Sequence, residues 1–318
     1  MNPPFSVIFL TTLIGMGQGC FLAINIAKFI ENIAGANIIE STPFYAVSGV
    51  IVLALLLMGL VASFFHLGHP ERAWRAAAKW RTSWLSREVI VLPTLIALVF
   101  VFTILSIFPE YDIQIFHFND TGVISLSLIV GILGSICVIL LFVCTSMIYA
   151  CLQFLQEWHS PYTMLNFMLM GCSSGFILAL AISSFLTVQL VGYYSSIAFI
   201  LTIAAAVSRY LSLLRNKKLR PKSTLQSAIG VKNNKVRQIS SGVMGTTYNL
   251  HLFKHGKGII FIRSVKMLFL LFTFIAPIAL LSIQLYYPNS IIIILTLIIQ
   301  YLGLIMERWY FFAEANHP

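Results

Sequence analysis

Charged side chains are scarce in this sequence. Asp, Glu, Lys and Arg make up 9% of its 318 residues, whereas a soluble globular domain has about 25%. Hydrophobic residues make up 59%, and the mean hydropathy is +0.92. A chain with so little polar surface cannot face water over most of its area, so we expect a polytopic membrane protein. Its apolar runs are continuous rather than alternating, which favours spanning helices over a membrane barrel.

Several motifs of soluble and redox enzymes are also missing. The sequence contains no Walker loop, Rossmann fingerprint, HExxH or GxSxG motif. It has no C-x-x-C pair, and its five cysteines fall within or at the ends of the apolar runs. We therefore expect no metal site and no iron–sulfur cluster in this chain. No histidine lies in the middle of an apolar run, so we expect no haem, whose axial ligands are commonly histidines. We also expect no nucleic-acid partner.

Eight apolar runs are long enough to cross a bilayer as helices. We predict one all-α membrane domain over residues 1–318, in which the stretch from Phe5 is the first span rather than a cleaved signal peptide. The predicted spans are roughly 6–30, 44–66, 88–108, 122–150, 164–185, 188–211, 265–286 and 290–312. The piece between the sixth and seventh spans, about 212–264, is the sizeable extramembrane loop.

The positive charges are concentrated in two segments. Of the 20 Lys and Arg residues, five lie between Arg72 and Arg87 and thirteen between Arg209 and Lys266. The segments 31–43 and 109–121 hold acidic residues and no Lys or Arg. With eight spans, both basic segments lie on one side. The positive-inside rule then places them, with both termini, on the cytoplasmic side of a bacterial inner membrane. A surface that docks an acidic partner is expected to have the same charge pattern, so partner docking is an alternative explanation.

The basic loop at about 212–264 allows two interpretations. It can be a solvated loop attracted to lipid headgroups, at about 1 kcal/mol for each basic residue near an anionic surface. It can also be a platform for an acidic soluble subunit. The mixture of glycines, aromatics and bases between Gly242 and Gly256 favours an ordered platform in that part. The candidate docking residues are Arg215, Lys217, Lys218, Arg220, Lys222, Tyr248, Lys254 and His255.

A cluster of reactive side chains lies where the second span meets the first basic segment. His66 ends the second predicted span and Glu88 opens the third, so the loop 67–87 returns both to the same membrane interface. The imidazole of His66 can exchange a proton near neutral pH. Glu88 can relay a proton if it is desolvated, or it can simply stabilise a helix start through the helix dipole.

Other polar groups near the spans have structural explanations beside functional ones. The tryptophans at 74, 80 and 84 can be interface anchors or ring-stacking groups, and Arg72 and Arg81 can extend toward headgroups. Glu157 and His159 offer a second carboxylate–imidazole pair. For Glu307 and Arg308 we expect a structural pair, satisfied mutually or by a neighbouring helix.

Taken together, these motifs resemble those of the dimethyl sulfoxide reductase membrane anchor subunit family. The resemblance runs through nearly the whole chain in order. It is carried by the segments His66–Trp74, Trp84–Glu88, Met147–Cys151, Glu157–Pro161, Met244–Gly256 and Glu307–Pro318.

The resemblance implies eight transmembrane helices without haem. It implies that the chain holds a molybdopterin catalytic subunit and a four-cluster iron–sulfur subunit on the membrane, oxidises menaquinol, and passes its electrons to the nearest cluster. His66 matches the family's quinol-site histidine and Glu88 its glutamate. The implied quinol-binding set is His66, Arg72, Trp74, Arg81, Trp84 and Glu88.

Two other functions stay open from the residues alone. One is a secondary transporter or an ion-translocating subunit, although few polar residues pair at mid-membrane as a transporter would need. The other is a purely structural anchor whose quinol binds elsewhere in the complex. The sequence does not fix the terminal acceptor or the direction of electron flow.

Overall fold

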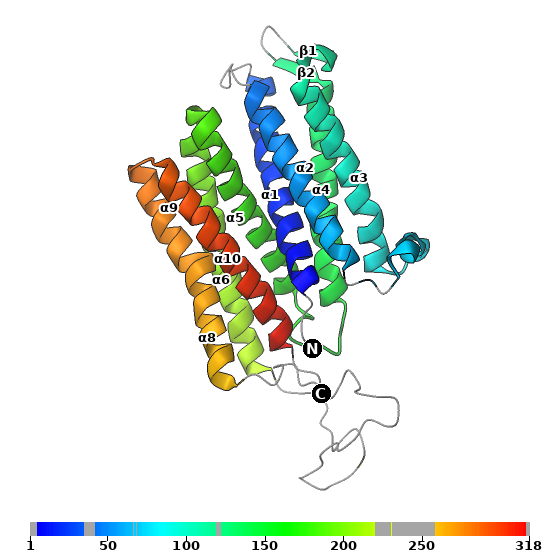
Figure 1. Cartoon of the computed structure of the whole chain (residues 1–318), viewed down its shortest axis with the longest axis vertical. Helices are drawn as coiled ribbons and strands as arrows, with labels where there is room; N and C mark the ends of the chain where they lie inside the picture. Colours follow the sequence, from blue (N-terminus) through cyan, green and yellow to red (C-terminus); the bar gives the residue numbers. More distant parts are fainter. Residues whose placement is uncertain are drawn as a thin grey trace.

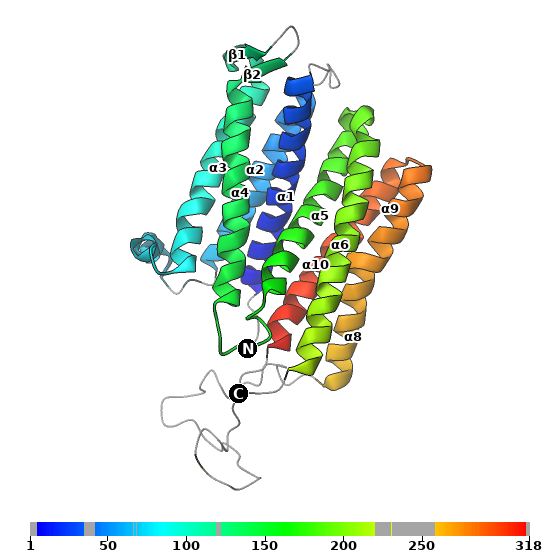
Figure 2. The same ribbon diagram turned by 180° about the vertical axis from the view of Figure 1, so that it is seen from behind.

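A computed structural model describes residues 5–34, 42–65, 67, 69–118, 122–219, 230 and 258–315. Spanning helices that follow one another in the chain run in opposite directions in a single bundle, so α1 and α5, which lie side by side, run parallel (Figures 1 and 2). The helices are α1 (Phe5–Ala34), α2 (Thr42–Phe64), α3 (Trp84–Ile107), α4 (Leu126–Ala150), α5 (Pro161–Leu186), α6 (Val191–Lys218), α8 (Ile259–Leu270), α9 (Ala276–Tyr286) and α10 (Ser290–Glu314). A π-helical turn, η4 (Leu271–Ile275), joins α8 to α9.

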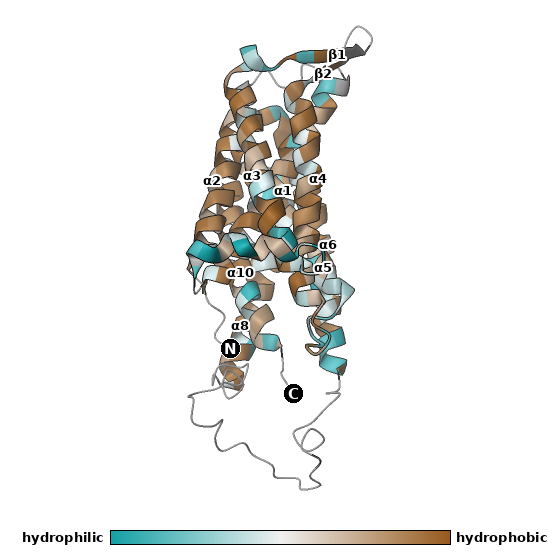
Figure 3. Cartoon of the chain, turned by 90° about the vertical axis from the view of Figure 1, so that its right-hand side faces the viewer, coloured by the Kyte–Doolittle hydropathy of each residue, from teal (hydrophilic) through white to brown (hydrophobic). Residues whose placement is uncertain are grey.

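Among the described residues, eight helical segments are long and apolar enough to cross a membrane, which confirms the predicted spans. Their residues are predominantly hydrophobic along most of their length (Figure 3). One end of the bundle is where α1 and α3 begin and where α6 and α10 end; we call it the basic end, because the described arginines and lysines of 72–87 and 215–218 lie there. The opposite, acidic end carries Glu31, Glu110 and Asp112.

Polar caps at several helix starts explain where the spans begin. Side-chain oxygens of Ser83, Ser125, Ser160 and Asn289 each accept a hydrogen bond from a backbone N–H in the first turn of α3, α4, α5 and α10. Such a cap satisfies a donor that has no partner within the helix. Pro161 adds a residue whose fixed φ suits the first helical position of α5.

Several helix ends differ from the prediction, among them the end of α6 and the starts of α8 and α4. α6 continues through Lys218 and α8 begins at Ile259, so the predicted loop of 212–264 is shorter at both ends. Basic residues fill the last turn of α6, where cations are favoured by the helix dipole. The predicted span 122–150 begins with a strand: β2 (Gly122–Ser125) pairs antiparallel with β1 (Gln114–Phe118), and α4 starts after it. Among the described residues, this hairpin is the exception to the all-α prediction.

Helices α1 and α5 form the centre of the bundle. In their most apolar windows, 72% and 83% of the residues are buried, compared with 33–44% in the other six spans. Helices α2–α4 lie on one side of this pair and α6 and α8–α10 on the other (Figures 1 and 2).

Glycines allow α1 and α5 to approach closely. A Cβ atom on Gly175 would lie 2.1 Å from the backbone nitrogen of Cys20, and one on Gly19 would lie 2.2 Å from the carbonyl oxygen of Gly171. Small residues bring membrane helices together in this way, because lipid offers no hydrophobic driving force between them.

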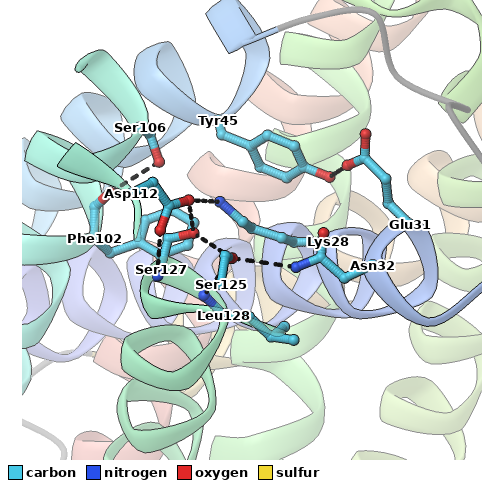
Figure 4. A network of polar contacts seen from close by, with 10 residues as sticks. All are labelled: Lys28, Glu31, Asn32, Tyr45, Phe102, Ser106, Asp112, Ser125, Ser127 and Leu128. Carbon is cyan, nitrogen blue, oxygen red and sulfur yellow. Dashed lines mark hydrogen bonds and ion pairs between the residues drawn. The ribbon is translucent and has the colours of Figure 1, made fainter. Parts of the chain in front are cut away.

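A polar cluster closes the acidic end around Lys28 of α1 (Figure 4). The Lys28 ammonium lies 3.8 Å from the Asp112 carboxylate, which also accepts hydrogen bonds from the backbone N–H and hydroxyl of Ser127. Beside it, Tyr45 donates a 2.7 Å hydrogen bond to Glu31. The cluster therefore ties α1, α2 and α4 to the segment that follows α3.

We predict that Gly175→Ala destabilises the bundle by about 1–3 kcal/mol, because the added methyl group meets backbone atoms that cannot move alone. Thermal unfolding in detergent micelles measures this change. Gly192→Ala is the control, since a Cβ atom there meets nothing within 4 Å. Equal unfolding midpoints for the two variants would contradict the packing described here.

Candidate functional site

His66 lies outside the described residues, but the segments on both sides of it are placed. Helix α2 ends at Phe64, and the ring of Phe65 is 82% exposed. Helix α3 begins at Trp84, at the same end of the bundle. The chain therefore returns to one interface, as the sequence predicted. Glu88 itself lies beyond the first turn of α3, where the helix dipole has little effect.

The segment between α2 and α3 forms a short 3-10 helix outside the bundle. This helix, η1 (Pro70–Lys79), lies beside the first turns of α3 with its axis across the spans (Figures 1 and 2). The ring of Trp74 is 70% exposed, and His69 and Arg72 pair with Glu71 at 3.1 and 3.6 Å.

Arg87 connects the end of this segment to α3. Its guanidinium donates hydrogen bonds to the carbonyls of Trp80 and Arg81 at 2.9 and 2.8 Å and lies over the ring of Trp84. Arg81 lies over the ring of Trp80. Among the described contacts, none joins Arg72, Trp74 or Arg81 to Glu88, so the structure does not bring these predicted quinol-site residues together.

The side chain of Glu88 points into the bundle rather than toward lipid. Its Oε1 accepts a 2.6 Å hydrogen bond from the hydroxyl of Thr145 on α4. Both residues line a cavity of about 20 Å³ between α1, α3, α4, α5 and α10. The polar residues that line it are Thr11, Thr12, Gln18, Glu88, Thr145, Ser174 and Arg308.

A second hollow lies on the opposite face of α1. It is an open groove of about 360 Å³ between α1 and α2, close to the end of α2. Its lining is apolar apart from one serine and consists of Ser6, Phe9, Leu13, Met58, Val61, Ala62 and Phe65. Helical spacing places Phe9 and Leu13 on one face of α1 and Ile14 and Gln18 on the other. Helix α1 therefore separates the groove from the cavity.

Three buried ionisable groups and the partly buried Glu314 form a chain of ion pairs next to the cavity. Arg209 Nε of α6 lies 2.9 Å from Glu307 Oε1, and its Nη2 lies 3.6 Å from Glu314 Oε2. Arg308 Nε lies 3.7 Å from Glu307 Oε2. The expected pair of Glu307 and Arg308 is thus present, and Arg209 joins it. Arg209 was not singled out from the sequence, although it lies inside the predicted sixth span, where a cation needs a partner.

The loop after α4 is fixed to the ends of α6 and α10. Both terminal nitrogens of Arg215 donate to main-chain carbonyls of this loop, at Gln156 and His159, each at 3.0 Å. The indole of Trp158 donates to the carbonyl of Phe311, and His159 Nδ1 lies 2.6 Å from the carbonyl oxygen of Ala150. His159 is therefore hydrogen-bonded to the backbone.

The proposed docking residues are only partly described. Lys217 and Lys218 are exposed in the last turn of α6, whereas the donors of Arg215 are used within the chain. The remaining five lie outside the described residues: Arg220, Lys222, Tyr248, Lys254 and His255.

The fold and these sites define a polytopic membrane protein with its described basic residues gathered mainly at one end. A family model for the DMSO reductase anchor subunit (DmsC) matches residues 1–313. A curated relative, a sulfite dehydrogenase subunit of Allochromatium vinosum, is 46% identical over 318 residues, which is 100% of this chain and 97% of the relative. The chain belongs to the DMSO reductase anchor subunit family and is a membrane anchor subunit of an oxidoreductase complex. The resemblance seen in the sequence is confirmed.

We predict that Glu307→Gln lowers the free energy of unfolding by about 3–5 kcal/mol, because it leaves Arg209 and Arg308 without their shared carboxylate. The midpoint of thermal unfolding reports the loss. The control is Glu71→Gln, which removes an exposed carboxylate and should change stability by less than about 0.5 kcal/mol. A Glu307→Gln midpoint equal to that of the control would show that the buried pairs add nothing.

Proposed function

We propose that this subunit exchanges electrons between a quinone in the bilayer and an iron–sulfur subunit docked at the basic end. The complex then connects the quinone to a molybdopterin catalytic subunit. The observation that carries the proposal is the apolar groove between α1 and α2, which opens to lipid and ends at Phe65, the residue that precedes His66 in the sequence.

The groove suits the tail of a quinone. Its volume of about 360 Å³ falls in the range of small-molecule sites, and its walls are Phe, Leu, Met and Val side chains. Phe9, Met58, Val61 and Phe65 are between 38% and 82% exposed, so a lipid-soluble molecule reaches them directly from the bilayer. An isoprenoid tail in this groove would hold the ring near Phe65, at the end of α2.

The chemistry at the ring needs a proton acceptor. Oxidation of a quinol releases two electrons and two protons, and reduction of a quinone takes up the same number. In the proposal, His66 hydrogen-bonds one ring oxygen and exchanges its proton. Glu88 is separated from the groove by α1, so it serves as a proton relay on the inner side rather than as a group that holds the tail.

Electrons must leave or arrive at the end where the ring lies. Lys217 and Lys218 are exposed at that end, and the arginines of η1 lie there too. This positive surface would attract an acidic partner and orient it. A cluster of that partner would then lie close to the ring, as electron tunnelling requires.

Two combinations of substrate and direction of electron flow are candidates. The family resemblance favours oxidation of menaquinol. The name of the relative from Allochromatium vinosum favours a sulfite-oxidising complex. In that reaction sulfite and water give sulfate, two protons and two electrons, and the electrons reduce a quinone. Adding sulfite and quinone, or S-oxide and quinol, to the purified complex separates these directions by the absorbance change of the quinone.

We predict that Val61→Trp raises the KM for quinone about tenfold, because the indole fills the groove. The kcat should change little. Steady-state assays on the whole complex in nanodiscs measure both constants. Val101→Trp, at a lipid-exposed valine of α3, is the matched control and should leave KM unchanged. Unaltered KM in both variants would mean that quinone does not use this groove.

His66→Leu should lower quinone-linked turnover by about 100-fold, the usual contribution of a positioned acid or base. Subunit assembly and reaction with a soluble electron mediator should be retained, since the partner cofactors are untouched. Full quinone-linked turnover would remove His66 from the mechanism. Together with labelling by a quinone analogue confined to the partner subunits, it would favour a purely structural anchor.

A further inference from the structure

We infer that η1 binds anionic phospholipids of the leaflet at the basic end, through the side chains of Arg75, Lys79 and Arg81. The binding element is a short helix that lies in the plane of the membrane at the level of the headgroups. The inference goes beyond the proposed function, because lipid binding at η1 needs neither a quinone nor a partner subunit. The ligand is defined by its chemistry, which is a phosphate group at the edge of hydrocarbon.

The position of η1 fits a membrane interface. Its axis runs across the spans, and it lies at the level where α2 ends and α3 begins (Figures 1 and 2). Figure 3, which is seen from that side, shows η1 lying across the front of the bundle. A span begins and ends where the hydrocarbon core gives way to headgroups. The helix η1 therefore lies at headgroup level, in the orientation that interfacial amphipathic helices adopt.

The sequence of η1 separates a side that packs on the protein from a side that faces outward. A 3-10 helix has about three residues in each turn, so its side chains form three faces. The half-buried residues are the alanines Ala73, Ala76 and Ala77, whose small side chains let η1 lie against α3. The outward side carries the large polar and aromatic residues of the segment: Arg72, Trp74, Arg75, Lys79 and Trp80.

Most cations of this segment have no acidic partner. Residues 70–81 contain three arginines and one lysine but a single acid, Glu71. Glu71 pairs with its neighbour Arg72. Among the described residues, no carboxylate forms an ion pair with Arg75, Lys79 or Arg81. Exposed guanidinium and ammonium groups form charge-assisted hydrogen bonds with phosphate oxygens, so the three unpaired cations are suited to lipid headgroups.

Two tryptophans place these cations at the edge of hydrocarbon. The guanidinium of Arg75 lies over the ring of Trp74, 5.5 Å from its centre, and that of Arg81 lies over Trp80 at 5.4 Å. The two tryptophans are 70% and 52% exposed. Exposed indoles collect at the headgroup level of membranes, where one part of the ring is apolar and the N–H is wet. A cation–π contact uses no hydrogen-bond donor, so the N–H groups of both arginines remain available to phosphate.

The surroundings of η1 favour lipid over an acidic protein as its ligand. Exposed residues on the neighbouring helix ends are apolar: Leu85 and Ile90 of α3 are 51% and 42% exposed, and Phe64 of α2 is 43% exposed. Helices α6 and α8 extend farther toward the basic end than η1 does (Figures 1 and 2). A soluble subunit at the end of the bundle therefore meets Lys217 and Lys218 of α6, whereas η1 lies to the side, among lipid. The charge of η1 still attracts such a subunit at long range.

Photolabelling of the whole complex in nanodiscs tests the inference. The nanodiscs consist of phosphatidylcholine with a trace of phosphatidylglycerol that carries a photoactivatable group beside its headgroup. Labelled peptides are mapped by mass spectrometry. The label should appear in residues 70–81. Excess unlabelled phosphatidylglycerol should compete with it, and the same excess of phosphatidylcholine should not, because η1 binds the anionic headgroup.

The variant Arg75→Gln/Lys79→Gln/Arg81→Gln should lower this label about tenfold or more, because each basic residue near an anionic surface adds to the attraction. The matched control is Lys217→Gln/Lys218→Gln, which neutralises exposed cations at the end of α6. Its label in residues 70–81 should equal that of the wild type.

The wild-type result alone can overturn the inference, without relying on the folding of a variant. A wild-type complex without label in 70–81, or with label that phosphatidylcholine competes equally well, would contradict anionic lipid binding. So would a label that the triple variant retains in full. Label that appears only after the partner subunits are stripped away would instead show that η1 binds a protein. Quinone-linked turnover enters none of these readouts, so their outcome is separate from that of the proposed function.

Discussion

The rest of this structure depends on the contact of α1 with α5, where backbone lies against backbone. Gly19 and Gly175 leave no room for a Cβ atom at this crossing. The contact holds α1 in the centre of the bundle while its first half still reaches the lipid on the side of α2. One helix therefore presents an apolar groove on one face and a polar cavity on the other. The lipid-facing groove and the inner cavity are then separated by the width of a single helix.

The buried charges follow from the same constraint. Hydrocarbon offers no hydrogen bonds, so each polar group on the inner side of the spans needs a partner in the protein. Arg209 and Glu307 satisfy this need between α6 and α10, and Lys28 and Asp112 do so at the acidic end. The first pair lies next to the cavity. The ion pairs that join α6 to α10 at the basic end therefore border the cavity through Arg308.

The sequence predicted the spans, the shared end of the basic segments and the family, because long apolar runs and unequal loop charge are local signals. It also placed Glu88 near the interface. It did not predict that Glu88 faces inward or that Arg209 pairs with Glu307. These depend on how each helix is rotated about its axis, which tertiary packing decides. The extended end of α6 was missed because its last turn is polar, and hydropathy marks only the part of a helix in the bilayer core.

The central claim is that quinone binds on the lipid-facing side of α1, in the groove, and not in the interior. A photoactivatable quinone analogue, cross-linked in the intact complex and mapped by mass spectrometry, tests it most directly. The account predicts labels on Phe9, Met58, Val61 or Phe65, competed by excess quinone. Competed labels on the residues of the inner cavity, such as Ile14, Thr145 or Ser174, would contradict it.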